Sequence, residues 1–114
     1  MAYNEKIAGR IRAALAHLSK VEEKKMFGGI AFMVNGKMCI TVGKDRIMCR
    51  VDPAIHDDVS TGTGIQTVKM RGREYKGFLH INEDLIKTKK ALDYWIQLAL
   101  DFNKIAKSSK KSNR

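Results

Sequence analysis

The feature of this sequence that most limits its fold is an Asn35-Gly36 pair set between two apolar runs. The run before it covers residues 25–34, the run after it covers residues 37–42, and both are rich in strand-forming residues. An Asn-Gly pair favours a type I′ turn, because such a turn needs positive φ at both central residues. A second turn follows, and residues 46–51 then return with alternating apolar and polar side chains. The sequence therefore predicts a meander of three antiparallel strands.

Helical patterns lie on both sides of this meander. Residues 3–19 carry apolar side chains at three- and four-residue spacing, which predicts an amphipathic helix. Either Asn4 is its N-cap, or Tyr3 already lies inside its first turn. After the meander, Asp52 precedes the only proline, Pro53, an arrangement that favours the start of a helix. We expect a short helix there, ending near Val59.

A second hairpin and a closing helix complete the pattern. Residues 66–71 alternate, Gly72-Arg73 is the expected turn, and residues 75–81 form the next strand. Asn82 then caps a long helix. The apolar residues expected on the buried stripe of that helix are Leu85, Leu92, Trp95, Ile96, Ala99, Phe102 and Ile105.

The order α-β-β-β-α-β-β-α predicts an α+β fold with two layers, in which helices cover one face of an antiparallel sheet. A length of 114 residues suits one domain. We expect that domain to span residues 1–103. Residues 104–114 follow as a disordered basic tail, because they contain five cations, no carboxylate and few apolar side chains.

Composition excludes several classes of protein. The longest apolar run, Ile30–Val34, is far shorter than the roughly 20 residues that span a bilayer, and no secretion signal is recognisable. Two cysteines without an export signal indicate reduced thiols. We therefore expect a cytoplasmic protein without a membrane partner. The net charge of +10 permits nucleic acid as a partner.

One segment carries a specific motif of four fixed residues and a hairpin turn. The motif residues are Met26, Phe27, Gly28, Gly29, Asn35 and Gly36. This segment resembles the Met-Phe-Gly-Gly signature of the N-terminal domains of the TfoX/Sxy family. The similarity extends from about Tyr3 to Phe102 and includes Lys76-Gly77-Phe78 and the helix that carries the tryptophan.

The resemblance implies a stand-alone bacterial member of the family that lacks the C-terminal domain. Two-domain members regulate natural competence together with the cAMP receptor protein at promoters. The family supplies no catalytic residues and no cofactor. The resemblance thus implies a non-enzymatic regulatory or interaction domain, linked to transcription or competence through a protein partner or through self-association.

Gly28 and Gly29 need a physical reason, because glycine weakens a strand. One interpretation is that a partner or ligand presses against the bare backbone. The other is a β-bulge, or room for the last helix to pack against the sheet. Both interpretations remain open at the level of sequence.

The candidate catalytic and metal-binding residues are few. Cys39 and Cys49 are expected nearly opposite each other on adjacent strands, either as small buried hydrophobes or as a redox or soft-metal pair. Two thiols without further ligands make a poor metal site, so we expect no metal. His17, His56 and His80 lie on different elements and belong to no recognisable nucleophile motif, so we expect no enzymatic activity.

A cluster of cations around the later strands gives the alternative function. Its members are Arg46, Arg50, Lys69, Arg71, Arg73 and Lys76, joined by Lys110 and Lys111 of the tail. If they share the sheet face opposite the helices, they form a basic platform for direct nucleic-acid binding. Tyr75 and Phe78 lie nearby for stacking on bases, but their opposite parity predicts that they cannot share one regular face.

Overall fold

The computed structural model describes residues 3–26 and 28–106. Its helices are α1 (Glu5–Ala14), α2 (His56–Val59) and α3 (Lys89–Asn103), with the short 3-10 helices η1 (Pro53–Ile55) and η2 (Glu83–Ile86). Its strands are β1 (Val21–Met26), β2 (Gly29–Val34), β3 (Lys37–Val42), β4 (Arg46–Arg50), β5 (Ile65–Met70) and β6 (Arg73–Asn82). They form one antiparallel sheet in the order β1-β2-β3-β4-β6-β5.

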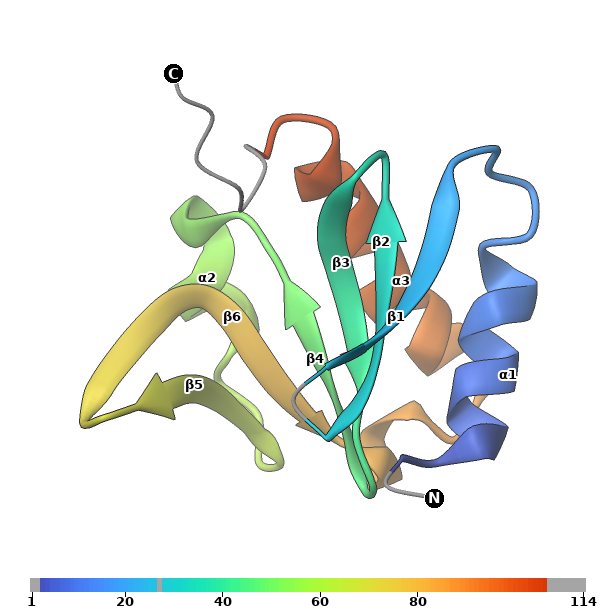
Figure 1. Cartoon of the computed structure of the whole chain (residues 1–114). Helices are drawn as coiled ribbons and strands as arrows, with labels where there is room; N and C mark the ends of the chain where they lie inside the picture. The colour runs from blue at the N-terminus through green and yellow to red at the C-terminus, as the bar shows by residue number, and fades with distance from the viewer. Residues whose placement is uncertain (1–2, 27, 107–114) are drawn as a thin grey trace.

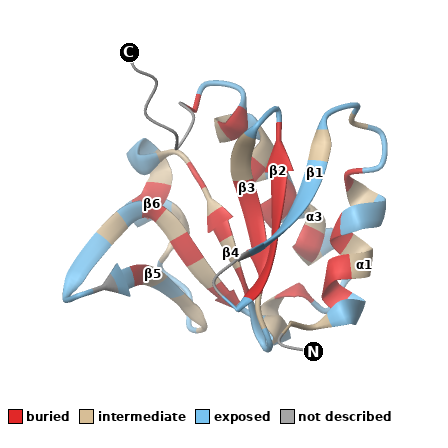
Figure 2. Ribbon diagram, viewed as in Figure 1, coloured by how far each residue is buried: buried red, intermediate tan, exposed pale blue. Residues whose placement is uncertain are grey.

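The two longer helices cover one face of this sheet. Figure 1 shows α3 behind the central strands, with α1 beside it. Alternate residues of the central strands join Ile7 and Ile11 of α1 and Trp95 and Ile96 of α3 in one buried core, and Figure 2 shows this burial concentrated in the middle of the sheet. The predicted α+β class and the arrangement of helices on one face are confirmed.

The predicted meander is confirmed by its turn geometry. Asn35 and Gly36 have φ values of 55° and 77°, the positive values that a type I′ turn needs. The structure adds β1, which precedes the meander and pairs with β2 along its whole length. The sequence did not predict β1 as a separate strand, because Glu22, Glu23 and Lys24 carry no alternating apolar pattern.

The capping predictions are confirmed, whereas the predicted length of the first helix is wrong. The side chains of Asn4 and Asp52 accept hydrogen bonds from the backbone N–H groups of Ile7 and Ala54. However, α1 ends at Ala14, well before the predicted end at residue 19.

The closing helix is divided, although one long helix was predicted. Asn82 caps η2, and a new N-cap, Thr88, then starts α3 by accepting a hydrogen bond from the N–H of Ala91. The assignment of Ile105 to the buried stripe is wrong, because it follows the end of α3 and is 69% exposed.

The folded contacts continue slightly beyond the expected boundary at residue 103. The ammonium group of Lys37 donates hydrogen bonds to the carbonyl oxygens of Asn103 and Ala106, at 2.6 and 3.1 Å. Ala106 itself is buried. Lys37 therefore satisfies carbonyl groups at the C-terminal end of α3. No described helix has the length and apolar character needed to cross a membrane.

Candidate binding face

The sheet surface turned away from α1 and α3, here called the open face, is the candidate functional site. Strand registers align Thr41 with Met48, Met48 with His80, and His80 with Gln66. These four residues alternate with core residues of the same strands, so they form a row across the open face. Next to this row, β2 is buried along its whole length.

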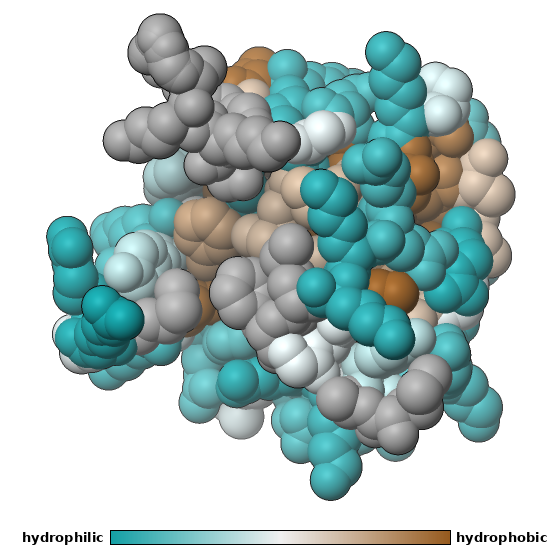
Figure 3. All heavy atoms as spheres, in the orientation of Figure 1, coloured by the Kyte–Doolittle hydropathy of each residue, from teal (hydrophilic) through white to brown (hydrophobic). Residues whose placement is uncertain are grey.

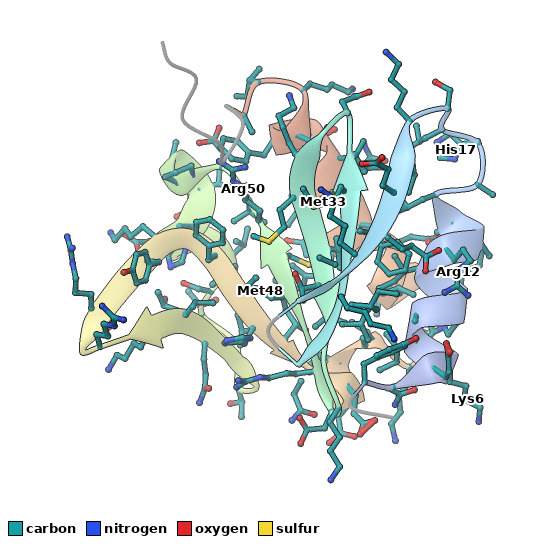
Figure 4. All side chains as sticks on the ribbon, in the orientation of Figure 1. Lys6, Arg12, His17, Met33, Met48 and Arg50 are labelled. Atoms are coloured by element: carbon teal, nitrogen blue, oxygen red, sulfur yellow. The ribbon has the colours of Figure 1, made fainter. Side chains whose placement is uncertain are left out.

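A cavity of about 810 Å³ opens on this face. Its apolar lining includes Met38, Met48, Val68, Tyr75 and Phe78, contributed by strands β3 to β6. Figure 3 shows moderately apolar side chains left of and above the centre of this view, among hydrophilic ones. Figure 4 labels Met48 on β4, at the centre of the same face. A cavity of this size and lining is typical of small-ligand sites and of pockets for single anchor side chains.

The bend of β6 brings two aromatic side chains into this cavity. Tyr75 pairs with Val68 and Leu79 pairs with Thr67, so the register of β6 shifts by several residues against β5. Gly77 lies in this irregular stretch with a φ of 93°. Consequently Tyr75 and Phe78 both line the cavity, because the parity argument holds only for a regular strand and β6 is irregular between them.

Of the buried side-chain polar atoms that lack hydrogen-bond partners within the described residues, two belong to residues of the open-face cavity, and the third is Nη1 of Arg50. The two are the hydroxyl oxygen of Thr41, which is 6% exposed, and Nδ1 of His80. Both residues line the cavity. A buried polar atom without a partner is unfavourable in the free protein, so these two atoms are available to a bound molecule.

The unpartnered hydroxyl gives a testable expectation for stability. Replacing Thr41 with valine keeps the side-chain shape and removes the unsatisfied oxygen, so we expect the free energy of unfolding to rise by about 1 kcal/mol. Urea denaturation of wild type and Thr41→Val measures this change. An equal loss of stability would instead mean that the hydroxyl has a partner in solution.

His80 is expected to be neutral at pH 7. Burial, and secondarily the charge of Arg46, lower the pKa of His80 below its ordinary value of 6.5. The unfolded chain therefore binds a proton at His80 more readily than the folded protein does. The contribution of neutral His80 to stability is thus present above pH 6.5 and is lost as pH falls through the pKa of the folded state. An NMR titration of the imidazole protons should give a midpoint below 6.5, and a midpoint above it would contradict this environment.

The predicted cations do not form one platform. Arg46 and Lys69 line the cavity together with Lys44, which sequence reasoning missed. Lys76 instead forms an ion pair with Asp57 at 3.1 Å, directed toward α2. The tip of the β5–β6 hairpin carries Arg71 and Arg73, both exposed.

Arg50 is held between two aromatic rings. Its guanidinium carbon lies 5.6 Å from the ring centroid of Phe78 and 5.4 Å from that of Phe102. Cation–π contacts of this kind fix the side chain near the end of β4, labelled in Figure 4, and direct it away from the cavity lining, although its buried Nη1 has no hydrogen-bond partner within the described residues. Lys110 and Lys111, with Phe27 of the motif, lie outside the described residues.

The local backbone requires glycine at both motif positions, Gly28 and Gly29. A Cβ added at Gly29 would overlap the carbonyl oxygen of Val42, on neighbouring strand β3. Gly28 has a φ of 71°, a left-handed conformation that favours glycine in the turn between β1 and β2. The close approach is thus to a strand, and not to the last helix as one interpretation of the sequence supposed. Gly28 also lines the open-face cavity.

The cysteines and histidines are separated by the fold. Cys39 and Cys49 are free and buried in the core, and burial raises the pKa of Cys39 to about 12. Cys49 aligns with Ile40, one residue away from the position predicted opposite Cys39. Within the described residues, no group of three or more potential metal ligands occurs.

His56 and His80 point to different sides of the sheet. His56 is buried against Thr67 and Gly77, whereas His80 lies in the row on the open face. His17 belongs to neither place and borders a cavity between α1 and α3. The structure therefore does not bring the three histidines together.

Among the comparisons with known proteins, one with protein families gives a match. The family model described as the TfoX N-terminal domain matches residues 13–103, from the last turn of α1 to the end of α3. None of the curated proteins and none of the solved structures compared with the chain matches it.

Proposed function

Because the chain belongs to the TfoX N-terminal domain family, we propose that it is a non-enzymatic interaction domain that binds a regulated partner protein through its open face. The observation that carries this proposal is the apolar cavity on a sheet face that α1 and α3 do not cover. Apolar pockets that receive an anchor side chain are typical of protein interfaces. A role in transcription or competence predicts that the partner belongs to the transcription machinery.

The charge around the cavity indicates the chemistry of that partner. Lys44, Arg46 and Lys69 line it together with a single carboxylate, Asp45. A second copy of this chain would bring the same cations to the interface, and like charges in close apposition disfavour association. We therefore propose a partner segment with acidic residues around an apolar anchor, in preference to self-association.

Site-specific photo-crosslinking in the source cell tests this proposal. A benzophenone side chain is introduced at Lys44, exposed at the edge of the cavity, and in a matched variant at Gln97, exposed on α3. We expect position 44 to capture one acidic protein that position 97 does not capture. Equal capture from both positions, or capture only of a second copy of the chain, would contradict the proposal.

Direct nucleic-acid binding is the second candidate. One observation favours it: Tyr75 and Phe78 line the same cavity as Arg46 and Lys69, as in grooves that stack single-stranded bases beside cations. The dispersal of Arg50 and Lys76 to aromatic and carboxylate partners weakens it.

Fluorescence anisotropy distinguishes this second candidate from the first. Single-stranded DNA, duplex DNA and RNA are titrated with the full chain and with Tyr75→Ala across a series of salt concentrations. If the cavity is a single-strand site, the chain should bind single-stranded DNA or RNA more tightly than duplex DNA, and Tyr75→Ala should weaken that binding. Weak binding that does not depend on Tyr75 and is lost steeply as salt rises would reflect net charge alone.

A further inference from the structure

We propose that the open-face cavity binds a small apolar carboxylic acid, and that this ligand competes with docking of the partner protein. The control of docking rests on the function proposed above, whereas binding of the acid stands on the cavity itself. Three features carry the inference: the size and apolar lining of the cavity, its two unpartnered polar atoms, and the limited positive charge at one end.

The apolar part of the cavity fits a narrow hydrocarbon body. Met38, Met48 and Phe78 line it, and methionine side chains adapt readily to the shape of a ligand. Thr41 and His80 stand on either side of Met48, on strands that both pair with β4. Since paired strands lie about 4.8 Å apart, these two residues are roughly 10 Å apart across the floor. A ligand body of that length covers Met48 completely.

The polar part of the cavity fits one negative charge. Arg46, Lys69 and His80 line both the main cavity and an adjoining one of about 430 Å³, so they mark a shared polar end. Lys69 lies 3.9 Å from Glu74, which offsets part of its charge, whereas Arg46 has no ion-pair partner within the described residues. One available guanidinium matches a carboxylate, which it can bind through two parallel hydrogen bonds.

The unpartnered atoms supply the remaining recognition. The imidazole of His80 can donate from Nδ1 to a carboxylate oxygen once the tautomer places a proton there. The Thr41 hydroxyl, on the other side of Met48, offers a hydrogen bond to a second polar atom of the ligand, at the end far from its carboxylate. Binding thus satisfies groups that the free protein leaves unsatisfied.

Titration with decanoate, followed by NMR, tests binding of the acid. The protein carries isotope labels in its methionine methyl groups and backbone amides, and decanol serves as the uncharged control. We expect saturable shifts at Met38, Met48 and Thr41 with decanoate and an affinity at least fivefold weaker with decanol. Arg46→Gln should weaken decanoate binding about tenfold, because it removes a charge-assisted hydrogen bond.

Matched variants make this test specific. Arg71→Gln removes an exposed cation from the hairpin tip, outside the cavity lining, and should leave decanoate binding unchanged. Thr41→Val should raise the melting temperature and leave decanoate binding unchanged, because decanoate has no second polar atom for that hydroxyl to bind. Absence of saturable shifts, equal binding of decanol, or equal effects of the two arginine variants would each overturn the carboxylate site.

The crosslinking from position 44, repeated with decanoate, tests the competition. We expect the yield of the partner adduct to fall as the cavity fills. An unchanged yield at saturating decanoate overturns the competition alone, whereas absence of any adduct without decanoate overturns the proposed docking and leaves the acid site standing.

Discussion

Replacing Gly29 with alanine is expected to destabilise the domain by about 3 kcal/mol or more, enough to leave much of the chain unfolded. The added Cβ would overlap the carbonyl oxygen of Val42 and would lie 3.1 Å from its carbonyl carbon. Both atoms belong to the backbone of β3, so no side-chain rotation relieves the overlap. The pair β2–β3 would have to separate at the edge of the core. Urea denaturation and the melting temperature measure the loss.

Two other glycines provide matched controls for this substitution. Gly28 has open space around it but a φ of 71°, so Gly28→Ala should cost only about 1 kcal/mol. Gly9 lies in α1 with nothing within 4 Å, so Gly9→Ala should stabilise the domain by about 0.5–1 kcal/mol. If Gly29→Ala were no worse than Gly28→Ala, the close approach of β2 and β3 would be wrong.

The second large effect is expected from His56→Ala, at about 3 kcal/mol. His56 is 1% exposed, and its Nδ1 accepts a hydrogen bond of 2.9 Å from the backbone N–H of Gly77. Nε2 therefore carries the proton and donates to the Thr67 hydroxyl at 2.8 Å. Removing the ring leaves a cavity in the protein and two polar groups without partners. It also removes a hydrogen bond that holds the bend of β6, which places Tyr75 and Phe78 at the open-face cavity.

The loss has a local signature as well as a global one. We expect amide hydrogen exchange at Gly77 to accelerate in His56→Ala well before global unfolding. Thr67→Val removes only one of the two hydrogen bonds and should cost about 1 kcal/mol. A His56→Ala protein with wild-type stability, or with Gly77 still protected, would contradict the role assigned to this histidine.

Local chemistry made much of the fold predictable. The Asn35-Gly36 turn and the caps at Asn4 and Asp52 depend on residues a few positions apart, and all three occur as expected. The alternating strand around Cys49 also buries the predicted side. Such features need no knowledge of distant partners.

The remaining features depend on contacts between distant segments. The second hairpin turns at Arg71 and Gly72, whose φ values are 54° and 78°, one residue before the predicted pair Gly72-Arg73. The bend of β6 depends on hydrogen bonds between Gly77 and both Val51 and His56, which are far apart in sequence. Glycine inside a predicted strand was the available signal, since it often marks a bulge.

The candidate site was only partly predictable for the same reason. The sequence identified Arg46 and Lys69, but charge alone could not show that Arg50 would lie between two aromatic rings or that Lys76 would pair with Asp57. The apolar lining was missed because Met38 and Met48 read as ordinary strand residues. Their exposure to a cavity becomes visible only when the register of β3, β4 and β6 is known.

The most direct test of the account is to map where the crosslinked partner binds. The purified partner is titrated into the protein labelled at its methionine methyl groups and at the indole of Trp95, which packs in the core on the helix side of the sheet. We predict saturable shifts at Met38 and Met48, no shift at Trp95, and weakened binding in Met48→Asp. Shifts confined to Trp95, or full affinity in a folded Met48→Asp protein, would show that the open face is not the binding surface.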